Sequence, residues 1–144
     1  MQVSVLLQVK GSDVVTVRPE ASATSVLAVL ARNHIGAVVV STDDRHIAGV
    51  LSERDIVRAL AARGAPALGE PASDLMSSDV STCEPDTTVE ELMATMTERR
   101  IRHVPVVVDG ELVGLVSIGD VVRDRISGLE DETRALHNYI SHPY

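Results

Sequence analysis

Two short motifs with the same spacing hold the residues best suited to bind a ligand, Ser52-x-x-Asp55 and Ser117-x-x-Asp120. Each follows a strand-like run and begins a helix-like one. Free backbone N–H groups and the helix dipole favour an anion, such as a phosphate, at a helix start. A serine hydroxyl adds a donor for phosphate, and an aspartate carboxylate only accepts, which suits the two vicinal hydroxyls of a ribose. The motifs therefore indicate a ligand that carries both phosphate and ribose.

The same motif has a purely structural interpretation. Ser-x-x-Asp resembles a capping box, which stabilises the start of a helix and binds nothing. Either motif taken alone favours this interpretation, whereas two motifs with matching flanks favour ribose binding in at least one of them. The two roles are compatible in one residue pair.

A basic cluster spans residues 99–103 of an otherwise acidic chain. Its arginines could lie at a solvated helix end, where cations meet the negative end of the dipole. Alternatively, Arg102 and His103 begin a strand and contact a nucleotide phosphate. The corresponding positions in the first half of the chain are Gly36 and Ala37, so two pockets built from these segments should differ in charge.

The chain contains an internal repeat. Residues 15–19 align with 81–85 at an offset of 66, and residues 49–55 align with 114–120 at an offset of 65. A match that keeps its register through half of the chain indicates two copies of one structural unit. Neither copy is large enough to bury a core well by itself, so we expect the two to pack sheet against sheet.

Each copy predicts the element order β-α-β-β-α. Ser22 and Asp86 are the expected N-caps of the first helices, and Gly64 is the expected end of the helix that starts at Ser52. Asp109-Gly110 predicts a tight hairpin, and the stretch 64–73 predicts a linker. The expected strands lie near 15–19, 37–41, 47–51, 81–85, 104–108 and 112–116, and the expected first helices at 22–33 and 87–100.

Composition excludes several classes of function. The chain has 144 residues, no Trp, no Phe and a net charge of −8, which argues against nucleic-acid binding because that affinity needs many basic contacts. Cys83 is the only cysteine, so no intrachain disulfide can form and packing is its expected role. We find no signal peptide or membrane-spanning run. The expected location is the cytoplasm, with no membrane partner.

No pattern predicts catalysis or a metal site. The glycines form no phosphate-binding loop or dinucleotide fingerprint, and no nucleophile stands beside a general base in the sequence. His137 and His142 lie close together but have no third ligand nearby. We therefore expect a protein that is not an enzyme and has no catalytic cofactor.

The doubled element order, with Gly-x-x-Ser-x-x-Asp at 49–55 and 114–120, resembles the CBS domain family. Residues 34–37 and 101–105 support the resemblance, which covers about residues 5–127. It implies an α/β (α+β) pair with repeats at 5–66 and 74–127 and a helical tail at 128–144. It also implies a regulatory homodimer that binds an adenosine compound, with AMP the first choice and ATP, NAD or S-adenosylmethionine the others. The effector protein is unknown. The alternative function is a ligand-independent interaction or dimerisation module.

The resemblance further implies two pockets, each of which joins the first and middle strands of one repeat to the Ser-x-x-Asp of the other. The pocket with more positive charge is the first choice, although Glu84 would repel an anion there. That pocket comprises Cys83, Glu84, Val89, Ile101, Arg102, His103, Val50, Ser52, Arg54 and Asp55. The other comprises Val17, Arg18, Ala23, Ile35, Gly36, Ala37, Leu115, Ser117 and Asp120.

The C-terminal segment shows a spacing close to a heptad repeat. Thr133 fills the one polar step, and Gly128 weakens the helix locally. A helix packed back on its own domain and a helix that crosses a dimer partner both remain open. The apolar residues of this stripe are Val122, Ile126, Leu129, Leu136 and Ile140.

Overall fold

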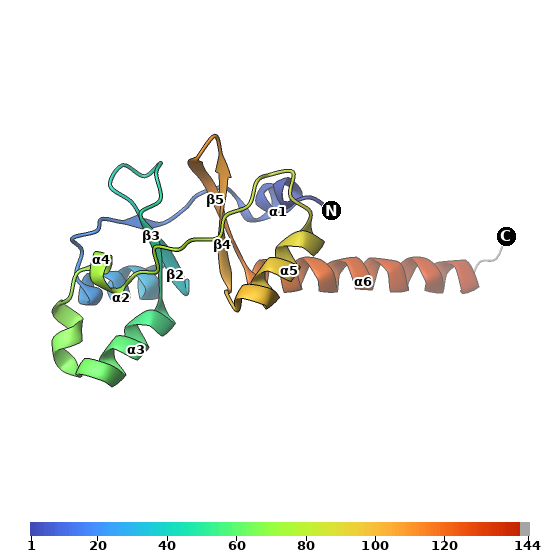
Figure 1. The fold of residues 1–144 in the computed structure, drawn as a ribbon. Helices are drawn as coiled ribbons and strands as arrows, with labels where there is room; N and C mark the ends of the chain where they lie inside the picture. The colour runs from blue at the N-terminus through green and yellow to red at the C-terminus, as the bar shows by residue number, and fades with distance from the viewer. Residues whose placement is uncertain (142–144) are drawn as a thin grey trace.

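The structure is a computed structural model and describes residues 1–141. Figure 1 shows two small sheets side by side, with helices around them and one long helix that leaves the body. The strands are β1 (Thr16–Val17), β2 (Ala37–Val40), β3 (Gly49–Ser52), β4 (His103–Val108) and β5 (Glu111–Ser117). The helices are α1 (Val3–Lys10), α2 (Ala23–Asn33), α3 (Glu53–Arg63), the 3-10 helix η1 (Ala65–Gly69), α4 (Ala72–Leu75), α5 (Val89–Arg99) and α6 (Ile118–Ser141).

The expected mixed α/β fold with two packed repeats is confirmed. In the first repeat β1 runs parallel to β2, and β2 is antiparallel to β3. In the second repeat β4 and β5 form an antiparallel pair, and the first strand is reduced to one bridge between Cys83 and Val106. That bridge is the counterpart, 66 residues on, of the pairing between Val17 and Val40. The two sheets are therefore the same unit with a shortened first strand in the second copy.

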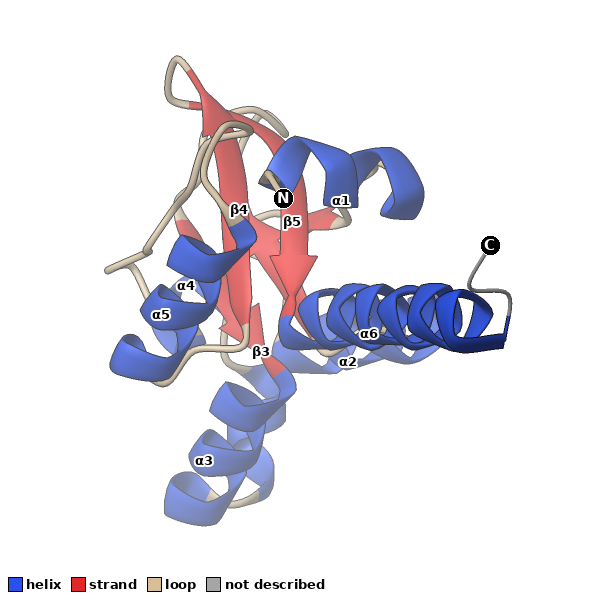
Figure 2. Ribbon diagram, turned by 90° about the vertical axis from the view of Figure 1, so that its right-hand side faces the viewer, coloured by secondary structure: helices blue, strands red, loops and turns tan. Residues whose placement is uncertain are grey.

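Each repeat encloses its own aliphatic core. Alternation along β2 places Val38 and Val40 in the first core, while Val39 faces away from it and is still fully buried. Pro105 of β4 is likewise buried between two residues of the second core. These outward-facing but buried residues mark the face along which the sheets pack together, as Figure 2 shows.

Helix termini follow the repeat closely, with one correction. Ser22 caps α2 by accepting a hydrogen bond from Ser25 N–H, as expected. Asp86 is not the N-cap of α5; Thr88 is, in a full capping box with Glu91. The physical reason is the acid three residues after Thr88, which returns a bond to the cap backbone. Gly64 ends α3 at a φ of 70°, as expected.

The expected hairpin is also present. Asp109 and Gly110 have φ values of 53° and 78°, the left-handed pair that a two-residue turn between twisted strands requires.

The segment before each repeat packs on the other repeat. In α1, Val3 N–H donates to Thr87 O at 2.8 Å; in α4, Ala72 N–H donates to Ala21 O at 2.7 Å. These bonds correspond to each other, with the two helices 69 residues apart and their acceptors 66 apart. Helix α1 was not predicted, and the expected linker is η1 and α4, anchored by the fully buried Ala72, rather than an open loop. The exchange ties the repeats together.

Helix α6 extends far beyond the body (Figures 1 and 2). Its only buried residue is Val121, in the first turn. Among the described residues, no helix has the length and hydropathy needed to cross a membrane.

Candidate functional site

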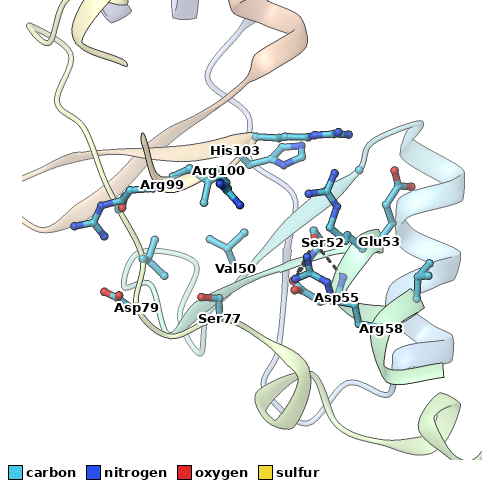
Figure 3. Close-up of a pocket in the computed structure, with 17 residues that line it drawn as sticks. Val50, Ser52, Glu53, Asp55, Arg58, Ser77, Asp79, Arg99, Arg100 and His103 are labelled. Carbon is cyan, nitrogen blue, oxygen red and sulfur yellow. Dashed lines mark hydrogen bonds between the residues drawn. The ribbon is translucent and has the colours of Figure 1, made fainter. Parts of the chain in front are cut away.

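A cavity of about 660 Å³ lies between the two repeats (Figure 3). The start of α3 forms one wall, the end of α5 and the start of β4 form the opposite wall, and the segment after α4 closes one side. The lining residues are Gly36, Val50, Ser52, Glu53, Arg54, Asp55, Val57, Arg58, Ser77, Asp79, Val80, Ser81, Arg99, Arg100, Ile101, Arg102 and His103.

Ser52 and Asp55 form a complete capping box within this cavity. Ser52 N–H and Ser52 Oγ each donate to Asp55 Oδ2 at 2.9 Å, and Asp55 N–H donates to Ser52 Oγ at 3.3 Å. All of these contacts leave Asp55 Oδ1 unused, and no group in residues 1–141 donates to it. The structural role of the motif is thus fulfilled by one carboxylate oxygen. The other oxygen retains its capacity to accept a ligand hydroxyl.

The cavity is positively charged although the chain is acidic. Five arginines and three carboxylates line it, and the arginines come from α3 and from residues 99–102. Arg100 adopts the left-handed conformation at the end of α5, with a φ of 55°, and so turns the chain into β4. Its counterpart in the first repeat is His34, with a φ of 53°. The repeat geometry thus places these cations opposite Asp55, where they favour an anionic ligand.

His103 lies where the two halves of the molecule meet. A Cβ at Gly36 would lie 3.6 Å from His103 Cε1, so the missing side chain at Gly36 leaves room for the imidazole. Burial lowers the pKa of His103, and the positive charge of Lys10 lowers it further, against the opposing effects of Asp120 and Glu53. A ligand phosphate beside this ring would favour its protonation.

The Ser117–Asp120 motif has the same internal bonds but a different environment. Ser117 N–H and Oγ donate to Asp120 Oδ2 at 2.8 and 2.9 Å. Lys10 Nζ, from α1, also donates to this oxygen at 2.6 Å and to Leu115 O at 2.5 Å, while Arg123 donates to Asp120 Oδ1 at 3.0 Å. Burial alone would raise the pKa of Asp120, but the bonds from Lys10 and Ser117 outweigh it and the pKa is lowered. Protein groups therefore occupy both oxygens of this carboxylate.

The structure assembles most of the first-choice pocket and corrects part of it. Seven of the ten residues line the cavity, namely Val50, Ser52, Arg54, Asp55, Ile101, Arg102 and His103. Cys83 and Val89 lie in the core of the second repeat instead, because the short first strand and α5 turn them inward. Burial raises the pKa of Cys83 to about 11. Glu84 is exposed and does not line the cavity.

The other expected pocket is not assembled as an open site. Val17, Ala23 and Ala37 are buried, and Ile35 packs against the same first core. Gly36 instead lines the cavity of the first-choice pocket.

The polar members of that second set are engaged by the protein. Arg18 donates to Asp44 and to Ser41 O. Leu115 and Asp120 are held by Lys10, and Ser117 bonds to Asp120. Sequence reasoning did not include Lys10 because it lies in a helix that was not predicted.

Sequence reasoning also missed several residues of the open cavity. Val57 and Arg58 follow Arg54 and Asp55 by three or four positions, so helical spacing could have identified them. Residues 77–81 gave no such signal, because they reach the cavity through the pairing of Ser77 with Val50 across the linker. No group of three metal-ligating side chains occurs within residues 1–141. His142 lies outside the described residues.

Comparison with known proteins identifies the repeats. The CBS domain family model matches residues 8–62 and 72–126. The mitochondrial CBS domain-containing protein CBSX3 of Arabidopsis thaliana is 34% identical over 119 residues, which cover 80% of this chain and 58% of that protein. The chain thus spans less than two thirds of that relative.

Solved structures agree with the fold. The CBS-domain-containing protein ATU1752 from Agrobacterium tumefaciens superposes with a TM-score of 0.84 at 44% identity, over 87% of this chain and 99% of that one. The CBS domain pair of protein MJ0100, solved in complex with 5′-methylthioadenosine and S-adenosylmethionine, has a TM-score of 0.79 at 22% identity, over 89% and 98% of the two chains. At that identity the second likeness concerns the fold alone. The matched residues and the doubled architecture together establish that this chain belongs to the CBS domain family, as a tandem CBS pair of the regulatory type.

Proposed function

We propose that the chain is a non-catalytic sensor that binds one adenine nucleotide in the cavity beside Ser52 and Asp55. The observation that carries this proposal is the unused Oδ1 of Asp55, which faces a cavity lined by five arginines. A ribose needs an acceptor of this kind, and a phosphate needs the cations opposite it. The aliphatic side chains of Val50, Val80 and Ile101 supply apolar walls for the base.

The charge of the cavity favours AMP among adenosine compounds. Arg99, Arg100 and Arg102 would attract the phosphate of AMP, ATP or NAD and repel the sulfonium of S-adenosylmethionine. The complex of the MJ0100 pair supports adenosine as the shared element of recognition. We therefore keep AMP as the first choice.

Only one of the two half-sites is proposed to bind. Asp120 already accepts bonds from Lys10, Ser117 and Arg123, so a ribose there would have to displace charged partners. A pair with one open and one closed half-site binds one nucleotide per chain.

Ligand binding would change the packing of the two repeats. The cavity walls come from both repeats, so a ligand that contacts both favours the arrangement in which they fit it best. A partner protein that reads this arrangement would then respond to the nucleotide. We place this activity in a cytoplasmic homodimer with an unidentified effector, and assign it no nucleic-acid or membrane partner.

A ligand-independent interaction or dimerisation module is the second candidate. It is favoured by the capping boxes, which are complete without a ligand, and by the exposed helix α6. In this case Ser52 and Asp55 only stabilise the start of α3.

A thermal-shift screen tests the proposal. A ligand at 100 times its Kd adds about 2.7 kcal/mol to the stability of the native state. AMP, ADP, ATP and NAD should raise the Tm clearly, and GMP and CMP should do so much less. Equal shifts from every base would mean that only phosphate is recognised, and no shift from any of them would favour the second candidate. Incubation with ATP and NAD, followed by product analysis, tests the assignment as a non-enzyme.

A further inference from the structure

We propose that α6 pairs with α6 of a second copy of this chain as a parallel, two-stranded coiled coil. The helix is 24 residues long, and every residue from 125 to 141 is exposed. A single helix without tertiary packing is only marginally stable in water. The exposed length therefore requires a partner, and this inference holds whether or not the cavity binds a nucleotide.

The residues on one side of α6 follow a regular heptad spacing. Positions 122, 126, 129, 133, 136 and 140 are separated by alternating steps of four and three residues. The five apolar side chains in this stripe are 47–68% exposed, and a shallow groove runs along its middle, beside Ile126, Leu129 and Thr133. The opposite face carries Asp124 and Asp131. One apolar seam on a polar helix fits a single partner helix.

The residue types in the seam specify two strands. Ile126, Thr133 and Ile140 occupy the a positions and are all β-branched, whereas Leu129 and Leu136 occupy d positions. β-branched residues at a with leucine at d favour the parallel two-stranded form.

The flanking charges specify the parallel direction. In a parallel pair, each g residue faces the e residue five positions later in the other helix. Arg125 then faces Glu130 of the second copy, and Glu132 faces His137 of the second copy. Each of these pairs forms twice and joins opposite charges once the histidine is protonated.

An antiparallel pair is disfavoured by the same residues. To cover the whole stripe, it must place Ile126 opposite Leu136 of the second copy. Glu130 then faces Glu130 of the second copy, and Glu132 likewise faces its own equivalent. A shift by one heptad removes these like-charge contacts but leaves apolar residues at one end of the stripe uncovered.

Gly128 does not interrupt the seam. It occupies a c position on the outer side of the helix, with no atom within 4 Å of where a Cβ would lie. Val121 anchors the start of α6 in the second core. The two bodies would therefore lie at the same end of the coiled coil.

Disulfide trapping tests both the partner and the direction. In a parallel coiled coil the Leu136 residues face each other, so the Leu136→Cys chain should form a covalent dimer under mild oxidation. Asp131→Cys, on the outer face, is the matched control and should stay monomeric on a non-reducing gel. Cys83 is buried and should not contribute. A mixture of Ile126→Cys and Leu136→Cys chains that cross-links more readily than Leu136→Cys alone would overturn the parallel direction.

Sedimentation equilibrium without nucleotide tests whether α6 holds the dimer together. The wild-type chain should be a dimer, and Leu129→Asp combined with Leu136→Asp should weaken association at least a hundredfold. Both residues are exposed, so the circular dichroism of the body should be retained. A monomeric wild type, or a variant that dimerises as tightly as the wild type, would overturn the proposal. Neither outcome bears on nucleotide binding by the cavity.

Discussion

Lys10 Nζ lies 2.6 Å from Oδ2 of Asp120, whereas the equivalent residue of the other repeat, 69 positions on, is Asp79 on the wall of the open cavity. The two half-sites thus carry opposite charges at corresponding places. The Asp120 side chain is only 9% exposed, so Lys10 neutralises a nearly buried carboxylate. This single difference accounts for one closed and one open half-site in a protein built from two similar repeats.

Replacement of Lys10 should open the second half-site. In Lys10→Met, Asp120 keeps its bonds to Ser117 and Arg123 but loses the ammonium that occupies the place of a ribose. Isothermal titration with AMP should then show two sites per chain instead of one. Lys10→Arg retains the charge and serves as the matched control with one site. A stoichiometry of one in both variants would mean that Lys10 does not close this half-site.

The reverse exchange should impair the open cavity. Asp79→Lys places an ammonium where Lys10 lies in the other repeat, within reach of Asp55. Competition for a charge-assisted bond worth about 1.5–3 kcal/mol should weaken AMP binding roughly ten- to a hundredfold. Asp79→Ser, which adds no cation, should bind AMP nearly as well as the wild type. Tighter binding by Asp79→Lys would show that residue 79 faces the phosphate rather than Asp55.

Much of the second-repeat geometry could be predicted from the offset of 66, because corresponding residues meet the same local constraints. The turn from α2 into β2 and the turn from α5 into β4 both pass through left-handed residues, His34 and Arg100. The same offset maps Ser22 onto Thr88, the observed cap. Asp86 was preferred only because aspartate is a good cap in general.

The exchange of α1 and α4 between repeats could not be predicted in the same way. Each helix contacts residues that are distant in the sequence, and their mutual offset of 69 breaks the register of the rest. The weak match of Ser4, Leu6 and Leu7 to Ser73, Leu75 and Met76 was the only local signal. Without α1, Lys10 had no place in the site.

The contact between Gly49 and the segment after α4 should be sensitive to size. A Cβ at Gly49 would lie 2.5 Å from Met76 Sδ and 2.7 Å from Ser77 O, which is too close for any atom. Gly49→Ala should lower the free energy of unfolding by about 1–3 kcal/mol, because the linker must move away from β3. Gly69→Ala, which has open space around the added carbon, is the control for urea unfolding and should change stability far less. Equal stabilities for the two variants would contradict the packing described here.

Stability should depend on pH through His103. Burial lowers its pKa in the folded state below the ordinary value of about 6.5. Between these two pKa values the unfolded chain binds a proton that the folded chain does not, so the free energy of unfolding should fall as the pH drops below about 6.5. It should stop falling through this residue once the pH passes below the folded-state pKa. In His103→Gln this part of the loss should disappear from urea unfolding curves at pH 7.5 and 5.5, and an unchanged loss would refute the assignment.

The most direct test of the nucleotide-binding claim compares two conservative substitutions by isothermal titration with AMP. The wild-type chain should bind one AMP. Asp55→Asn should bind roughly ten- to a hundredfold more weakly, because it loses a charge-assisted acceptor for the ribose. Its apo stability should fall by no more than about 1 kcal/mol, as for a capping residue. Asp120→Asn, in the half-site that Lys10 closes, should bind AMP like the wild type. If the wild type binds no AMP, or if Asp55→Asn binds it as tightly as the wild type does, then Ser52 and Asp55 only cap α3 and the proposed function is wrong.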